Sequence, residues 1–175
     1  QEKVNASLII RSKIGRTGYS IVLDSKKHDR TILSFRGSNS DIKYNEIKLK
    51  KLNTKWFYFS SLMGASYKTL EKLAKYAKKK NIKIAFNTSS YLAKKGKRYL
   101  KNILNKTEIL ILNKEEASIL VGKSTIENLL KKISRLGPNI VAITDGKQGV
   151  YVLRNEIIYT GKPNNLKVIE TTGAV

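Results

Sequence analysis

The stretch EILILNKEEASILVG, residues 108–122, decides the fold class of this chain. Residues 108–113 form a short and almost continuously apolar run, which is typical of a strand buried on both faces of a parallel sheet. Asn113 closes that run, and residues 115–121 then predict a short helix that ends at Gly122. A strand that leads directly into a helix is the repeating unit of α/β proteins.

The same alternation continues on both sides of this unit. Helices are predicted to begin at Ser66, around residues 94–105, and at Ser124, which has capping-box spacing to Glu127. Further apolar strands are predicted at 55–62, 82–87 and 139–146. We therefore expect an α/β protein with a parallel-sheet three-layer sandwich, in which helices cover both faces of the sheet.

Two β-hairpins accompany these units. Residues 16–24 and 30–37 are β-branched and aromatic runs joined by a polar turn, and residues 149–161 predict a second hairpin. A last strand is predicted at 166–170. We assign residues 1–40 to a β lid segment with the entry to the core, and residues 41–175 to the α/β core.

The composition bounds the class of protein. With 41% hydrophobic and 27% charged residues, the 175-residue chain can form a globular core. No apolar run approaches the roughly 20 residues of a membrane span. The absence of cysteine excludes disulfides and thiolate metal sites and fits a reducing, cytoplasmic environment. One histidine and 13 acidic residues make His–carboxylate triads and histidine-based metal sites effectively unavailable.

The formal net charge of +22 has two interpretations. Lysine and arginine neutralise phosphates, so the chain can be a nucleic-acid binder. The other interpretation is a lysine-rich chain with solvated helix faces, because only seven of the 35 basic residues are arginine. The densest belt, residues 68–106, falls mostly at predicted helix-surface positions and has few interleaved aromatic residues. We expect nonspecific attraction to nucleic acid at most.

Polar and small residues follow four predicted strands, at the edge where ligands of open α/β sheets gather. They are Asn87 to Ser90, Asn113 with Glu116, Thr144 to Gly146, and Thr171 to Ala174. Structural explanations stay open for some of them. Asn113 and Glu116 also have the spacing of a helix N-cap with its third residue, and Thr144 and Gly146 can form a simple turn.

The order of these segments is more specific than any one of them. RTGYSIVLDSKKHDRTILSFRGSN, FNTSS, ILNKEEASIL, TDGKQGVYV and ETTGA follow one another along the chain. This series resembles the ribokinase-like (PfkB) carbohydrate and nucleoside kinases over essentially the whole chain. The resemblance implies transfer of a phosphoryl group from ATP, with Mg²⁺, to a hydroxyl of a sugar or nucleoside.

The resemblance also implies roles for residues. NKEEA resembles the family's Asn-x-x-Glu motif, which gives Asn113 and Glu116 a part in placing magnesium and phosphate. TDGKQG resembles its Thr-x-Gly-x-x-Gly segment, which brings Thr144 and Gly146 to the ATP phosphates. ETTGA resembles the start of its Asp-Thr-x-Gly-Ala-Gly-Asp signature, whose backbone forms an anion hole, here Thr172, Gly173 and Ala174.

The hairpin at 16–37 resembles the family's lid over the substrate. Candidate substrate contacts on it are Tyr19, Arg36 and Asn39, and in many members this lid also forms a homodimer contact. Nothing in the sequence decides which sugar or nucleoside these residues face.

Three departures from the family pattern stand out. Glu170 replaces the usual Asp at the head of the signature, and Val175 stands where its second Gly belongs. The Asp general base would lie beyond Val175, and the family's early Gly-Gly-Asn segment and sugar-binding Asp are not found. We expect the middle portion of such a kinase, inactive by itself. A non-catalytic kinase-like interaction module and a basic nucleic-acid-binding domain stay open as alternatives.

Overall fold

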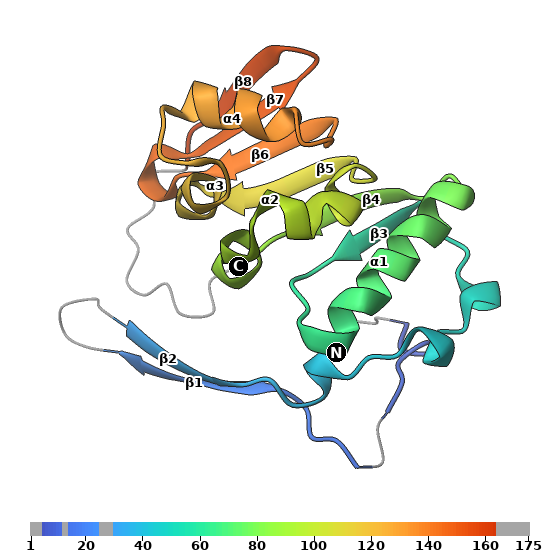
Figure 1. Ribbon diagram of the computed structural model, residues 1–175. Helices are drawn as coiled ribbons and strands as arrows, with labels where there is room; N and C mark the ends of the chain where they lie inside the picture. Colours follow the sequence, from blue (N-terminus) through green and yellow to red (C-terminus); the bar gives the residue numbers. More distant parts are fainter. Residues whose placement is uncertain (1–4, 12–13, 25–29, 164–175) are drawn as a thin grey trace.

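A computed structural model describes residues 5–11, 14–24 and 30–163 of the chain. Its main element is a six-stranded sheet, and a separate two-stranded hairpin extends away from that sheet (Figure 1). The predicted strand at 166–170 and the segment ETTGA lie outside the described residues.

The six strands follow one another in space in the order of the chain, β3-β4-β5-β6-β7-β8. The pairs from β3 to β6 are parallel, whereas β7 and β8 are antiparallel additions. The strands are β3 (Trp56–Phe59), β4 (Lys83–Asn87), β5 (Ile109–Asn113), β6 (Ile140–Thr144), β7 (Val150–Arg154) and β8 (Ile157–Gly161). The α/β class and the mostly parallel sheet expected from the sequence are thereby confirmed.

Four helices connect or follow these strands: α1 (Gly64–Lys79), α2 (Ser90–Leu104), α3 (Lys114–Val121) and α4 (Ile126–Ser134). Their apolar sides pack on alternate residues of the strands, such as Phe86, Leu110 and Ile143, which are almost completely buried. Burying each such side chain stabilises the fold by about 1.5–3 kcal/mol. The core of the described chain therefore lies between the sheet and this helical layer.

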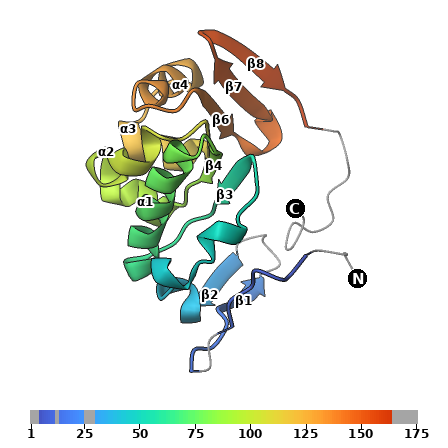
Figure 2. The same ribbon diagram turned by 90° about the vertical axis from the view of Figure 1, so that its right-hand side faces the viewer.

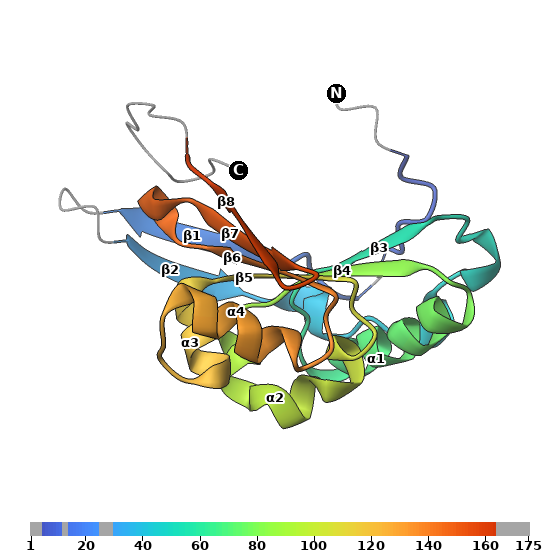
Figure 3. The same cartoon turned by 90° about the horizontal axis from the view of Figure 1, so that it is seen from above.

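All four helices lie on the same face of the sheet (Figure 3). Within β5, Leu110 and Leu112 face the helices and are buried, whereas the alternate residues Ile109 and Ile111 on the other face stay partly exposed. The described chain thus shows two of the three layers expected from the sequence. The continuously apolar strands indicate a sheet made for cover on both faces, but the described residues supply helices to only one.

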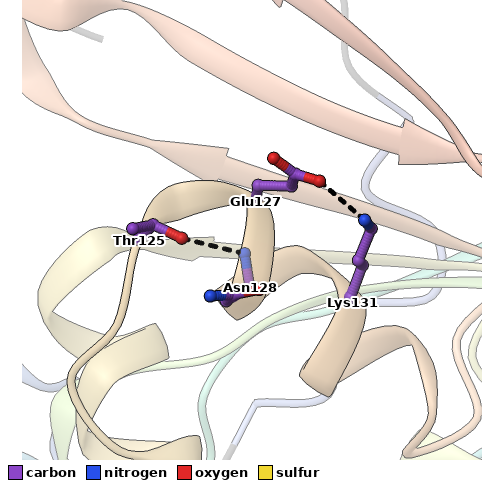
Figure 4. A network of polar contacts seen from close by, with 4 residues as sticks. All are labelled: Thr125, Glu127, Asn128 and Lys131. Atoms are coloured by element: carbon purple, nitrogen blue, oxygen red, sulfur yellow. Dashed lines mark hydrogen bonds and ion pairs between the residues drawn. The ribbon is translucent and has the colours of Figure 1, made fainter.

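Three predicted helix starts differ from the structure. The helix predicted around residues 94–105 is α2, which already begins at Ser90. Ser66 does not cap α1, which begins at Gly64; its buried hydroxyl instead accepts a hydrogen bond from the amide of Ile42 at 2.8 Å. Ser124 does not cap α4. Thr125 does so, with its hydroxyl accepting a bond from the amide of Asn128 at 3.4 Å (Figure 4).

The hairpin consists of β1 (Tyr19–Asp24) and β2 (Arg30–Phe35), as the sequence predicts. Three short 3₁₀ helices, η1 (Gly37–Ser40), η2 (Tyr44–Glu46) and η3 (Leu49–Lys51), lead from it to β3. In the strand register Tyr19 lies opposite Phe35, and their ring centroids are 5.3 Å apart. The hairpin stands beside the sheet rather than packing on it (Figure 2), so most of its apolar side chains are exposed.

No helix in the described ranges is both long and apolar enough to cross a membrane. The division into residues 1–40 and 41–175 stays a prediction.

Candidate active site

The ends of β5 and β6 bring together two motifs that lie 31 residues apart in the sequence. Asn113 and Thr144 are register partners at the carboxyl ends of these parallel strands. Both are exposed, and the helix or turn that follows each strand begins at the next residues. The two motifs therefore lie side by side at one edge of the sheet, as the sequence predicts.

Glu116 forms part of the helix cap at this edge. Its carboxylate accepts a bond from the amide of Asn113 at 3.0 Å, and the Asn113 side chain accepts one from the amide of Glu116 at 2.8 Å. This is a complete capping box at the start of α3. The backbone of Ser90, at the start of α2, also favours the charged form of Glu116. The loop after β4 is therefore close to the loop after β5 at this point.

The side chain of Glu116 is only 8% exposed. Burial raises the pKa of Glu116, and the negative charge of Glu115 adds to this effect, while the amides of Asn113 and Ser90 oppose it. The structural interpretation of the Asn113–Glu116 spacing is thereby confirmed. Their role toward magnesium and phosphate stays a prediction.

The turn after β6 exposes backbone. The amide of Asp145 donates to the carbonyl of Gly149 at 2.8 Å, which closes a loop around the 3₁₀ helix η4 (Gly146–Gln148). Gly146 has a φ of +50°, and a Cβ placed on it would meet no atom within 4 Å. The backbone at Gly146 is therefore open to close approach by a ligand.

Gly149, at the other end of this turn, is needed for packing. Its φ is +100°, and a Cβ there would lie 2.1 Å from the carbonyl oxygen of Gly161. The two glycines of the Gly-x-x-Gly segment therefore serve different purposes: Gly149 lets β7 and β8 close against the turn, and Gly146 leaves a free surface.

An ion pair that the sequence did not predict joins the two motifs. The ammonium group of Lys114 lies 2.7 Å from the carboxylate of Asp145, with side-chain exposures of 48% and 20%. Each residue directly follows the last residue of its strand, Asn113 or Thr144. The sequence has opposite charges at these two equivalent positions, and that pattern could have predicted the ion pair.

Two buried hydroxyls mark the ends of β3 and β4. The side-chain oxygens of Ser61 and Thr88 have no hydrogen-bond partner among the residues that the structure describes. Buried hydroxyls without a partner are costly, and in native proteins they usually face an ordered water or a bound molecule. Thr88 belongs to the segment FNTSS that the sequence assigned to this edge.

The lid candidates form a second group, at the hairpin. Tyr19 lies on β1, while Arg36 and Asn39 lie at its base, where the amide of Asn39 donates to the carbonyl of Arg36 at 3.1 Å. A hollow of about 860 Å³ lies near this base, with Thr17, Ser38, Asp41 and Ala65 among its lining residues. In the described part of the chain, no hydrogen bond or ion pair connects this group to the edge at Asn113. The anion-hole candidates Thr172, Gly173 and Ala174 lie outside the described residues.

Comparison with protein families decides the affiliation. The pfkB family carbohydrate kinase model matches residues 1–174. This chain belongs to the PfkB family. The resemblance expected from the sequence is thereby confirmed.

Individual relatives agree with this affiliation. The PfkB chain is 34% identical over 167 residues to an ATP-dependent 6-phosphofructokinase of Thermoanaerobacterium thermosaccharolyticum, covering 89% of this chain and 51% of that protein. Its fold resembles ribokinase from Thermotoga maritima, with a TM-score of 0.71, 18% identity and 90% and 52% of the two chains covered.

The fold also resembles adenosine kinase from Schistosoma mansoni in complex with 2-fluoroadenosine. The TM-score is 0.79 at 19% identity, with 93% of this chain and 54% of that chain covered. The PfkB chain thus spans about half the length of these relatives.

The residues at this edge of the sheet suit a Mg²⁺ ion that has few protein ligands. No group of three or more histidine, aspartate or glutamate side chains within the described ranges could hold a metal by itself. Asn113 and Asp145 nevertheless present oxygen atoms at this edge, and oxygen is the ligand that Mg²⁺ prefers. Mg²⁺ in kinases usually has one or two protein ligands, with water and nucleotide phosphates as the others. The residues present suit that arrangement.

Proposed function

We propose that this PfkB chain takes part in ATP- and magnesium-dependent transfer of a phosphoryl group to a hydroxyl of a sugar or nucleoside. The observation that supports this most directly is the register pairing of Asn113 with Thr144, next to the open backbone of Gly146. Because the reaction consumes ATP and the chain has no cysteine, the proposal includes a cytoplasmic location.

In this proposal the turn after β6 binds the nucleotide. The amides of Asp145, Gln148 and Gly149 donate to carbonyls within the turn, so those of Gly146 and Lys147 would donate to phosphate oxygens, and Thr144 adds a hydroxyl donor. Asn113 and Asp145 offer oxygen atoms to magnesium and its water ligands, while Glu116 fixes the direction of Asn113 through the capping box. When bound, the metal offsets charge on the phosphates.

The remaining roles belong to the segments away from this edge. Tyr19, Arg36 and Asn39 face the phosphoryl acceptor, and the hairpin limits the access of water. Thr172, Gly173 and Ala174 supply backbone amides to the phosphoryl group as it is transferred. A carboxylate base for the acceptor hydroxyl is not among the residues assigned here.

Nucleotide binding is the first test. Isothermal titration of the chain with ATP should show binding that requires Mg²⁺, and Gly146→Ala should weaken it by about tenfold, or about 1.4 kcal/mol. Gly122→Ala is a matched control, because Gly122 also has a positive φ, +86°, and no atom within 4 Å of an added Cβ. Equal effects of the two substitutions on ATP affinity would contradict the proposal that the turn after β6 binds the nucleotide.

Phosphotransfer is the second test, run on the gene product with any flanking coding sequence included. ADP release should depend on one or more members of a panel of sugars, sugar phosphates and nucleosides. Absence of turnover with all of them, while ATP still binds, would contradict the proposed activity and leave the nucleotide site intact.

A further inference from the structure

The helices α1 and α2 contain a large excess of positive charge. Residues 64–106 include thirteen lysine and arginine residues and a single acidic residue, Glu71, whereas the rest of the chain has 22 basic and 12 acidic residues. We call the exposed cations of the two helices the basic face: Lys68, Lys72, Lys75, Lys78 and Lys79 on α1, and Lys94, Lys95, Lys97, Arg98 and Lys101 on α2.

The two helices that make up the basic face are in contact. On α1, Lys68, Lys72, Lys75 and Lys79 recur every three or four residues and so lie in one row along the helix. The hydroxyl of Tyr67 on α1 donates to the carbonyl of Tyr99 on α2 at 3.0 Å, and their rings stack with centroids 4.3 Å apart. These contacts hold α2, which is kinked at Gly96, beside α1.

The face is separate from the candidate active site. Its side chains are exposed and belong to α1 and α2, which cover one face of the sheet (Figure 3), whereas Asn113 and Thr144 lie at the strand ends. A molecule on this face would therefore leave the edge at Asn113 and Thr144 accessible.

Little within the protein offsets this charge. Glu71 accepts a hydrogen bond from the side chain of Asn102 at 2.9 Å, and the two ion pairs in the described ranges lie at Lys114–Asp145 and Lys131–Glu127. Burial lowers the pKa of Lys106, two residues beyond α2, and the charges of Lys78 and Lys75 on α1 lower it further, with Glu71 opposing. Lys78 and Lys75 thus repel a third positive charge that lies close to them.

We propose that the basic face binds the phosphate backbone of nucleic acid without sequence preference. The row from Lys68 to Lys79 extends about 16 Å at 1.5 Å per residue, and duplex DNA has one negative charge per about 1.7 Å. Nine of the ten cations are lysine, which acts as a point charge and seldom reads bases. The exposed large hydrophobic side chains of these helices are Tyr91 and Tyr99. Neither helix offers the exposed aliphatic residues that insert into a membrane.

The test compares two variants of equal net charge. The first replaces Lys68, Lys75, Lys97 and Lys101 of the basic face by glutamine. The matched control replaces four exposed lysines elsewhere, Lys50, Lys55, Lys132 and Lys162. Circular dichroism and thermal unfolding establish that both variants keep the fold, and titration with Mg²⁺-ATP checks that the edge is unaffected.

Binding is measured by fluorescence anisotropy with a labelled 16-base-pair duplex of random sequence between 50 and 200 mM KCl. The unmodified chain should bind with a steep salt dependence, about 0.9 in the slope of log K against log salt for each phosphate contacted. The basic-face variant should lose about two to four units of slope, and the control less than about one. Equal losses in both variants, or no binding by the unmodified chain at 50 mM KCl, would overturn the proposal. So would binding to phosphatidylserine vesicles without binding to the duplex.

Discussion

Glu116 is held by opposing influences. Burial favours its neutral form, and the amides of Asn113 and Ser90 favour its charged form, with the net effect that its pKa is raised. A glutamate in an unfolded chain has a pKa of about 4.3, so the folded chain binds this proton more tightly than the unfolded chain. The stabilisation from Glu116 is therefore fully present below about pH 4 and declines as pH rises through its folded pKa.

We predict that Glu116→Gln removes this decline, because glutamine keeps an acceptor oxygen but does not titrate. The free energy of unfolding of the variant, relative to the unmodified chain, should increase with pH above about 4. Urea unfolding at several pH values between 4 and 8 measures the difference.

Glu127→Gln provides a control of opposite sign. The hydrogen bond and the charge of Lys131 lower the pKa of Glu127, so its stabilisation is present above its unfolded pKa and is lost as pH falls. If the two variants showed the same pH dependence, the account of Glu116 would be wrong.

Gly149 and Gly146 should differ in their tolerance of alanine. Gly149→Ala places a Cβ against the carbonyl oxygen of Gly161 and strains the backbone, which should cost about 3 kcal/mol or more. The Cβ of Gly146→Ala would contact no atom, so the substitution should lower the free energy of unfolding by roughly 1 kcal/mol, from the left-handed backbone alone. Thermal unfolding of both variants tests this, and similar losses would contradict it.

At the scale of elements, the Lys114–Asp145 pair connects the start of α3 to the turn after β6. Since Lys114 is about half exposed, solvent screening limits its contribution to stability to less than about 1 kcal/mol. Its effect should instead be local, because it restrains two loops that no continuous helix or strand joins.

We predict that Lys114→Met and Asp145→Asn accelerate amide hydrogen exchange in residues 113–116 and 145–149 while changing global stability little. The double variant should exchange no faster than either single variant, since each removes the same interaction. Lys131→Met, which breaks the pair within α4, should leave these residues unchanged (Figure 4). Additive effects of the two single substitutions would show that the pair does not restrain the loops.

The hairpin has one strongly apolar face. Tyr19, Ile21, Leu23, Leu33 and Phe35 lie on the same side of β1 and β2, and each is 47–60% exposed. Exposed apolar area of this kind is typical of a protein–protein contact. It supports the homodimer contact that the resemblance to the family implies for the hairpin, which we keep as a proposal.

Leu33→Lys should shift the chain toward monomer in sedimentation velocity experiments at micromolar concentration. Ser34→Lys is the control. Ser34 pairs with Ser20 on the opposite face of the same hairpin, and the substitution adds the same charge as Leu33→Lys. A monomeric unmodified chain, or equal effects of both substitutions, would contradict a hairpin dimer.

The elements show where sequence reasoning succeeds. The apolar runs and the helix spacing locate strands β3 to β6 and the order of the helices, since each depends on residues close together in the chain. Helix starts were less accurate. Ser66 bonds to Ile42, 24 residues away, and Ser124 gives its place to Thr125. The Lys114–Asp145 pair joins two separate units, so only a comparison of equivalent strand-end positions, and no pattern local to either segment, could reveal it.

At the scale of the whole molecule, the sheet has one covered face and one open face. Trp56, Tyr58, Ile157 and Tyr159 lie on the open face near its two edges, and all four are exposed. The exposed apolar side chains of the sheet therefore lie mainly on the open face, which no described helix covers.

We predict that this open face binds hydrophobic dyes and promotes self-association. Tyr58→Lys combined with Ile157→Lys should reduce binding of anilinonaphthalene sulfonate several-fold. Tyr67 and Tyr99 stack on the helical side, so Tyr99→Lys serves as a control for the tyrosine substitution at Tyr58, away from the open face. Trp56, the only tryptophan and 41% exposed, should be readily quenched by acrylamide in the dilute chain. Dye binding that both variants reduced equally would show that the open face is not its site.

The strand order β3-β4-β5-β6-β7-β8 repeats the order of synthesis. Each of the strands β4 to β8 pairs with the strand made just before it, so none of these described strands is inserted between two others. Contacts that are local in sequence are made quickly, because little loop entropy is lost in closing them. The sheet can therefore grow strand by strand as the chain leaves the ribosome, and at every stage the part already made is a contiguous sheet with one growing edge.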